Sequence, residues 1–188
     1  MKKYITTITV ALALAGCAGS TLNTGATQAL KESKGYKVGE VKVTLAKSGF
    51  LDMSREQSLY PDTTKMAAYF KQDIEKYLKQ NAASCEGGES CLTLDVDVNY
   101  MRKFNLNSVT VSAPVVDRTI SIHKGNQVLY TESKKGLKPH SGGMFGSALN
   151  EMAVFTKAGN EQPNLEDERK DIDLISKLTV KEVLSLGK

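Results

Sequence analysis

The chain has 188 residues, of which 25 are basic and 21 acidic, giving a formal net charge of +4. This balance is typical of an ordinary globular protein and argues against a nucleic-acid binder, which usually concentrates basic residues on one surface. Aromatic residues make up 6% of the sequence and tryptophan is absent, so a ligand groove lined with aromatic rings is not expected.

The first residues have the order of an export signal. Lys2 and Lys3 precede a short apolar run from Ile5 to Ala15. This run is too brief to cross a bilayer, and it ends in small residues as a cleavage site does. We therefore expect residues 1–16 to form a signal peptide that the mature chain lacks.

The sequence Leu14-Ala15-Gly16-Cys17 resembles the lipobox of bacterial lipoproteins. The resemblance implies that the thiol of Cys17 is acylated and that Cys17 becomes the first mature residue. An aspartate at position 18 would resemble an inner-membrane retention signal, whereas Ala18 permits sorting to the outer membrane. The acyl chains, at about 0.8 kcal/mol per buried methylene, would anchor the protein on the periplasmic face of that membrane. The alternative is an ordinary cleaved signal followed by an incidental cysteine.

The two remaining cysteines are Cys85 and Cys91, separated by a polar stretch of five residues. An even pair in an exported chain predicts a disulfide, which would act as a local staple of roughly 2 kcal/mol. The alternative is a redox or metal-binding pair. The spacing differs from the Cys-x-x-Cys of redox sites, and no histidine lies nearby in the sequence. We expect no metal site and no cofactor.

Residues 17–37 consist of the cysteine expected to be lipidated and a stretch dominated by small and polar residues. This composition predicts a flexible tether. Residues 38–188 predict a single α+β periplasmic domain. Alternation of apolar and polar residues predicts a first strand at Val41–Leu45. Asp62 or Thr63 then caps a predicted helix whose apolar residues recur every three or four positions: Met66, Phe70, Ile74, Tyr77 and Leu78.

Three further strands follow that helix. The clearest alternation in the chain, Leu92–Tyr100, predicts a long strand with one dry face. In the next strand the inward-facing residues have odd numbers before Pro114 and even numbers after it. This change predicts a bulge or bend at the proline. Residues 124–127 predict a hairpin turn, and Val128–Ser133 predict the last strand.

A long connection from Gly136 to Pro163 precedes a C-terminal helix with an acidic first turn. The predicted core face of that helix contains Ile172, Ile175, Thr179, Val183 and Leu186, widened by Leu174 and Leu178. The predicted order is β-α-β-β-β-α. We expect an α+β fold in which one four-stranded, mostly antiparallel but mixed sheet packs on two helices, with a short extra helix in the long loop.

Two further resemblances support this assignment. A hairpin at Ser121–Tyr130, followed by the loop Ser141-Gly142-Gly143-Met144-Phe145-Gly146 and a terminal helix, is similar to a family of uncharacterised bacterial lipoproteins. Residues 150–164 depart from that family as an insertion. The tether and two-layer architecture also resemble the lipopolysaccharide-assembly lipoprotein of the outer membrane. Both resemblances imply a fold and a location, and neither implies a chemical activity.

The loop 142–157 is longer than packing requires, and its glycines flank a stripe of flexible apolar side chains. We therefore expect four of its residues to contact a partner protein: Met144, Phe145, Leu149 and Met152. The alternative is a third small helix that lies on the sheet.

No catalytic residue is expected. His123 and His140 are isolated in the sequence, and Asp95 and Asp97 share the wet face of one strand, where exposed carboxylates are common. Glu40, Asp117 and Asp173 have no evident partners in the sequence either.

The sequence thus predicts a non-enzymatic outer-membrane lipoprotein that acts as an accessory or assembly factor of a cell-envelope complex. Its expected partners are the membrane, through the N-terminal lipid, and an envelope protein, with no nucleic acid. One alternative is a lipid or glycolipid carrier in the periplasm, with a cleft between the sheet and the long loop. A second alternative is a hydrolase without a recognisable motif, in which Asp95 or His123 would be essential.

Overall fold

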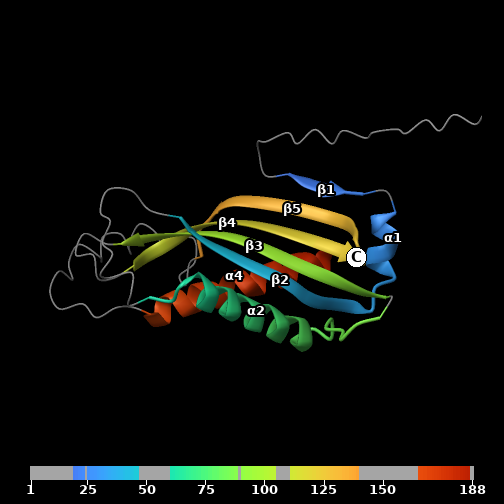
Figure 1. Cartoon of the computed structure of the whole chain (residues 1–188), viewed down its shortest axis with the longest axis horizontal. Helices are drawn as coiled ribbons and strands as arrows, with labels where there is room; N and C mark the ends of the chain where they lie inside the picture. The colour runs from blue at the N-terminus through green and yellow to red at the C-terminus, as the bar shows by residue number, and fades with distance from the viewer. Residues whose placement is uncertain are drawn as a thin grey trace, which may run out of the picture.

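The structure is a computed structural model of the chain, and it describes residues 19–23, 25–46, 60–88, 90–104, 111–139 and 165–186. A curved sheet lies over two long helices (Figure 1). In chain order the elements are β1 (Ser20–Leu22), α1 (Ala26–Lys31), β2 (Gly35–Ala46), α2 (Thr63–Gln80), β3 (Cys91–Phe104), β4 (Val111–Lys124), β5 (Gln127–Leu137) and α4 (Leu165–Ser185).

The strands form one sheet in the order β1-β5-β4-β3-β2. Strands β2 and β3 run parallel, and the other neighbouring pairs are antiparallel. Parallel neighbours need a crossover connection, which here includes α2. The predicted mixed α+β sheet is therefore confirmed. It has five strands rather than the predicted four, because β1 adds an edge strand beside β5.

The predicted tether, residues 17–37, is largely folded. Within it Ser20–Leu22 form β1 and Ala26–Lys31 form α1, and β2 begins before its end. Ala26 and Leu30, one helical turn apart, are 0% and 4% exposed and belong to the core. The prediction fails because two such short elements contain too few apolar residues to establish a periodicity.

The helix predicted after Asp62 is confirmed as α2. The Asp62 carboxylate accepts a hydrogen bond from the backbone N–H of Lys65 at 2.8 Å, which caps the helix N-terminus. The predicted apolar stripe is buried against the sheet, apart from the half-buried Tyr77, and consists of Met66, Phe70, Ile74 and Leu78. Asn81 forms the C-terminal cap, where the sequence predicts the end of the helix.

Helix α4 buries most of its predicted stripe, namely Ile172, Ile175, Thr179 and Val183. Leu178 is a correction, because its side chain is 49% exposed instead of widening the core face. The buried residues already fill the face of the helix that packs against the sheet, and Leu178 lies outside that face. Leu174 is half-buried.

The bend predicted at Pro114 is present as a change of register within β4. Met101 of β3 pairs with Val115, whereas Lys103 pairs with Ser112, so β4 contains an extra residue at this point. The predicted hairpin turn joins β4 to β5, and Gly125 in the turn has a φ of 59°, a conformation that favours glycine.

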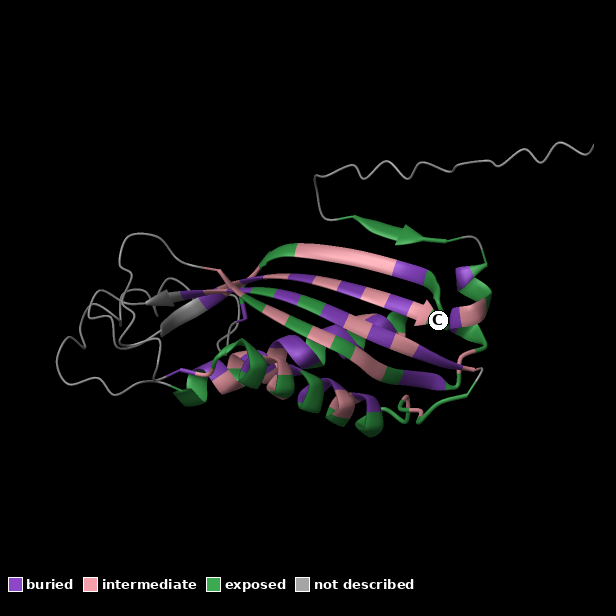
Figure 2. Ribbon diagram, in the orientation of Figure 1, coloured by how far each residue is buried: buried purple, intermediate pink, exposed green. Residues whose placement is uncertain are grey.

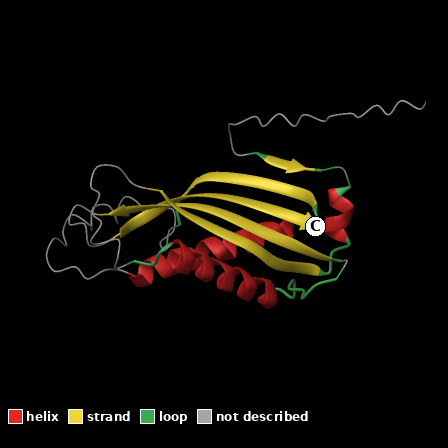
Figure 3. Ribbon diagram, in the orientation of Figure 1, coloured by secondary structure: helices red, strands yellow, loops and turns green. Residues whose placement is uncertain are grey.

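Helices α2 and α4 pack together on one side of the sheet (Figure 3). Buried residues alternate with half-buried or exposed residues along β3 and β4, as expected for strands with one covered and one open face (Figure 2). The predicted short helix in the long connection lies outside the described residues. Among the described helices, none combines the length and the hydropathy that a transmembrane span requires.

Candidate functional site

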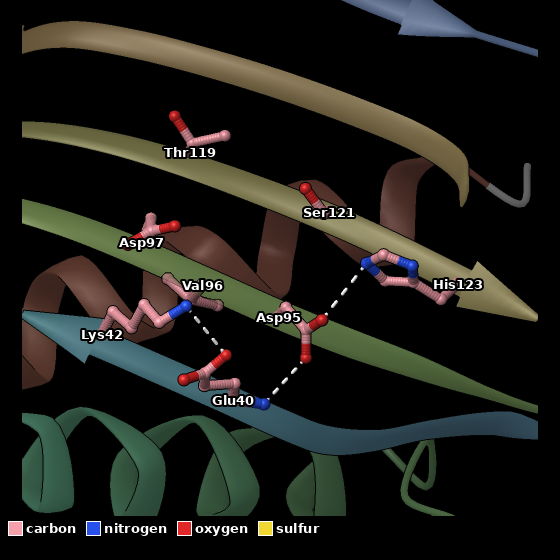
Figure 4. Close-up of a pocket in the computed structure, with 8 residues that line it drawn as sticks. All are labelled: Glu40, Lys42, Asp95, Val96, Asp97, Thr119, Ser121 and His123. Carbon is pink, nitrogen blue, oxygen red and sulfur yellow. Dashed lines mark hydrogen bonds and ion pairs between the residues drawn. The ribbon is translucent and has the colours of Figure 1, made fainter. Parts of the chain in front are cut away.

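A group of polar side chains lies on the open face of the sheet, across β2, β3 and β4 (Figure 4). They line a shallow depression of about 140 Å³. We call this group the open-face cluster. Its polar residues are Glu40, Lys42, Asp95, Asp97, Thr119, Ser121 and His123, and the buried Val96 also lines the depression. The cluster forms because alternate residues of each strand face the same side and the three strands are neighbours.

Asp95 is the most constrained carboxylate of the open-face cluster. Its Oδ1 accepts a hydrogen bond from the backbone N–H of Glu40 at 2.7 Å. Its Oδ2 lies 3.2 Å from Nε2 of His123, and both side chains are partly shielded, with exposed fractions of 36% and 23%. Asp95 therefore orients the imidazole of His123, and the two residues are partners although neither shows a partner in the sequence.

A bulge in β2 makes room for the Asp95 carboxylate. The register shifts between Val38 and Val41, so that Gly39 and Glu40 together lie opposite one residue of β3. A Cβ atom at position 39 would lie 2.1 Å from Oδ1 of Asp95 and 2.6 Å from a methyl carbon of Thr93. Gly39 is thus required by the close approach of a neighbouring side chain. A glycine inside a strand is the sequence signal that indicates such a site.

The remaining ion pair of the cluster is exposed. Nζ of Lys42 lies 3.0 Å from a carboxylate oxygen of Glu40, and the two side chains are 60% and 63% exposed. Such a pair contributes little to stability, because water screens it and two long side chains lose conformational freedom.

The cluster contains the residue types of a serine hydrolase, but not their geometry. Ser121 pairs with Asp95 across the strands, while His123 lies two residues further along β4. Residues two apart on one face are about 7 Å apart, which is too far for a hydroxyl to reach the imidazole. Among the described residues, no hydrogen bond joins Ser121 to His123. The arrangement is suited to binding polar groups.

Across the described ranges, no three His, Cys, Asp or Glu side chains gather closely enough to hold a metal ion.

Asp97 is exposed at the rim of the open-face cluster. Asp117 accepts a hydrogen bond from the backbone N–H of Gly136 at 2.8 Å. Asp173 accepts hydrogen bonds from Lys76 and Tyr77 of α2, at 2.5 and 2.6 Å. These contacts join segments that are distant in the sequence.

The predicted disulfide between Cys85 and Cys91 is present, with Cα atoms 5.9 Å apart. It closes the loop that leads from α2 into β3. Cys17, the predicted lipidation site, and His140 both lie outside the described residues. The predicted partner-binding residues also lie outside the described ranges: Met144, Phe145, Leu149 and Met152.

Two buried arginines on the covered face are absent from the sequence-based candidates. Arg102 of β3 donates to both oxygens of Glu168 in α4, at 2.5 and 3.0 Å, and to the carbonyl of Pro61 at 2.7 Å. The side chains of Arg102 and Glu168 are only 6% and 1% exposed. The guanidinium also lies over the ring of Tyr60, 5.2 Å from its centroid.

Arg118 of β4 forms the second buried contact with α4. Its side chain donates to Thr179 at 2.8 Å and pairs with Glu182, which also pairs with Lys134 of β5. Burial lowers the pKa of Arg118, although an arginine remains protonated. Both arginines occupy even-numbered positions, as do the apolar, inward-facing residues of their strands. This alternation could have identified both arginines as buried.

No protein-family model matches the sequence, and no curated protein does. Among solved structures, the chain is similar to a minor lipoprotein from Acinetobacter baumannii, whose crystal structure was determined at 2.35 Å. The two chains are 12% identical, with a TM-score of 0.31, and the match covers 76% of this chain and 90% of the other. A likeness of this degree is too slight to support a conclusion, and we draw none from it.

Proposed function

We propose that the protein is a non-enzymatic lipoprotein, anchored through acylated Cys17 to the periplasmic face of the outer membrane. In this proposal it acts as an accessory or assembly factor of a cell-envelope complex. The observation that carries the proposal is the sequence Leu14-Ala15-Gly16-Cys17, which ends two residues before Gly19, the first residue that the structure describes. The backbone N–H of Ser133 in β5 donates to the carbonyl of Gly19 at 3.2 Å.

This arrangement is what a lipid anchor requires. A cleavage before Cys17 would leave an acylated residue three positions before Ser20, where the edge strand β1 begins. The disulfide between Cys85 and Cys91 supports an oxidising compartment, where structural disulfides persist. Ala18 supports sorting to the outer membrane, as the lipobox resemblance implies.

The geometry of the open-face cluster supports a role without catalysis. The depression is shallow, and Ser121 is not positioned beside His123. A polar face with an oriented carboxylate and imidazole is suited to hydrogen bonds with another protein, since interfaces carry several such contacts around an apolar centre. The residues proposed for the apolar contact remain Met144, Phe145, Leu149 and Met152.

The first experiment tests the anchor. Cells expressing the full chain are labelled with a fatty-acid probe, and the Cys17→Ser variant serves as the control. We expect label on the wild type, recovery with outer membranes, and loss of both in the variant. An unlabelled wild-type protein would contradict the proposal.

The second experiment tests the partner. Gentle crosslinking in membranes and co-purification are expected to recover an envelope protein with the wild type. A variant with alanine at Met144, Phe145, Leu149 and Met152 should lose that protein while keeping its thermal stability. Unchanged partners together with a lowered Tm would show that these side chains only support the fold.

A further inference from the structure

A second depression lies between the end of β5 and α4, on the covered side of the sheet. It has a volume of about 400 Å³ and is more apolar than the open-face cluster. Leu137, Pro139, Ile175 and Leu178 contribute its apolar lining. We call it the β5–α4 groove. Leu178, which does not enter the core, is 49% exposed beside it.

The charges around this groove are mainly positive. Lys134, Lys138 and Lys181 line it together with Arg118, whereas Glu182 is its one carboxylate among the described residues. Glu182 already pairs with Arg118 and Lys134, and Glu132 of β5 also lies within 3.8 and 3.5 Å of these two residues. None of the described ion pairs includes Lys138 or Lys181, so their charges are available to an anion.

Arg118 gives the groove a cation that is built into the fold. The residue is 3% exposed, and its Nε is buried without a hydrogen-bond partner among the described residues. A buried donor without a partner costs about 1–3 kcal/mol, so an acceptor that reached it would be bound favourably. The groove thus combines a buried guanidinium, two uncompensated lysines and an apolar wall.

The N-terminal end of the described chain lies at the same edge of the sheet. The backbone N–H of Ser133 donates a hydrogen bond to the carbonyl of Gly19, which follows Cys17 by two positions in the sequence. The strand continues from Ser133 to Leu137 and then to Pro139, a distance of roughly 20 Å if fully extended. Figure 1 shows β1 and β5 at one edge of the sheet, while α4 runs behind the sheet beside α2.

We propose that the β5–α4 groove binds the headgroup of an anionic phospholipid in the bilayer that holds the anchor. This inference rests on the proposed lipidation of Cys17, because acyl chains at that residue bring the β1–β5 edge against the membrane. The phosphate accepts hydrogen bonds from Lys138 and Lys181, close to the buried guanidinium of Arg118. The glycerol and the first methylenes pack on Leu137 and Leu178. The bound lipid fixes which face of the domain is turned toward the periplasm.

The test uses the full lipidated chain in nanodiscs of phosphatidylcholine, with or without phosphatidylglycerol. Benzoylphenylalanine, a photo-crosslinking amino acid, is placed at the exposed position of Leu178, and a matched probe at the position of Lys42 on the open face. We expect a phospholipid adduct from position 178 when phosphatidylglycerol is present. We expect little adduct from position 42, because the open face is turned away from the bilayer.

Charge reversal tests the recognition of the headgroup. Lys138→Glu with Lys181→Glu should lower the adduct with phosphatidylglycerol by roughly tenfold, since each lysine near an anionic surface contributes appreciably to binding. The matched control is Lys71→Glu with Lys79→Glu, which changes the charge equally on the exposed side of α2 and should leave the adduct unchanged. Circular dichroism and Tm confirm that each variant is folded.

Three results would overturn the inference: equal adducts with and without phosphatidylglycerol, equal adducts from positions 178 and 42, or an equal loss in the α2 control. Mass spectrometry of Cys17 in the same preparation separates this failure from that of the proposed function. If Cys17 is acylated and no adduct forms, the groove proposal alone is wrong. If Cys17 carries no acyl chain, the anchoring proposal is wrong.

Discussion

The covered and the open faces of the sheet both pair a cation with a carboxylate, but burial differs greatly between them. On the covered face, Arg102 and Glu168 are 6% and 1% exposed and share two hydrogen bonds. On the open face, Lys42 and Glu40 are 60% and 63% exposed. The same type of contact therefore has different consequences: removing one buried partner leaves a charge that water cannot reach, whereas removing an exposed partner leaves a solvated charge.

The largest effect is expected for Arg102→Ala. Glu168 would remain buried without its cation, which typically destabilises a protein by about 3–5 kcal/mol. Urea unfolding followed by circular dichroism measures the change in the free energy of unfolding. The double variant Arg102→Met with Glu168→Leu removes both charges and should recover most of the loss. A double variant as unstable as Arg102→Ala would show that packing, and not charge, dominates this site.

Gly39→Ala comes next, with an expected loss of about 1–3 kcal/mol from overpacking. The added Cβ would lie 2.1 Å from the Asp95 carboxylate, which must move and lose its bond from the backbone of Glu40. Thermal unfolding measures the loss. In the Asp95→Ala background the same substitution should cost less, and a purely additive result would contradict the close approach described here.

Asp173 lies between the two extremes, with a side chain 38% exposed at the junction of α2 and α4. Burial acts to raise the pKa of Asp173, but hydrogen bonds from Lys76 and Tyr77 outweigh it, so this pKa lies below its ordinary value. A carboxylate with a lowered pKa in the folded state stabilises the protein above about pH 4, and this contribution disappears as the pH falls further. Solvent screening keeps the effect below about 1 kcal/mol.

Asp173→Asn should therefore make stability less dependent on pH in the acid range. Urea unfolding of both proteins at pH 6, and again at roughly pH 3, measures the difference. The wild type should lose more stability than the variant over this interval. An identical loss would mean that the contacts with Lys76 and Tyr77 do not favour the ionised carboxylate.

The smallest effect is expected for Lys42→Ala on the open face. Its pair with Glu40 is screened by water, so the free energy of unfolding should stay close to that of the wild type. The same urea titration measures it. A loss comparable to that of Arg102→Ala would remove the distinction between the two faces.

Periodicity predicted the elements that are long enough to show it. The stripe from Met66 to Leu78 and the alternation from Leu92 to Tyr100 each include at least four buried positions, so α2 and β3 were predictable. β1 and α1 were not, because three exposed strand residues and a single pair of buried helix residues form no pattern. Their order depends on tertiary contacts, such as the pairing of Leu22 with Tyr130.

The open-face cluster was less predictable than the fold. The sequence places Asp95 on a wet face, but the pair with His123 depends on the register between β3 and β4. The bond from Glu40 depends on a bulge in β2, which sequence alternation does not locate. Arg102 and Arg118 were overlooked for a different reason. The alternation along their strands places both on the covered face, but charged residues are rarely buried, so they were not expected there.

The two buried arginines have a consequence for how the chain is synthesised. Arg102 belongs to a strand, while Glu168, the carboxylate that neutralises it, belongs to a helix that leaves the ribosome later. Arg118 has Glu132 of β5 at 3.8 Å and gains its closer partner, Glu182, from the same late helix. Until α4 docks, the nascent sheet exposes two guanidinium groups on the surface that must become its dry interior. A polypeptide truncated before this helix would therefore be a ready target for proteases, and quality control would remove incomplete copies.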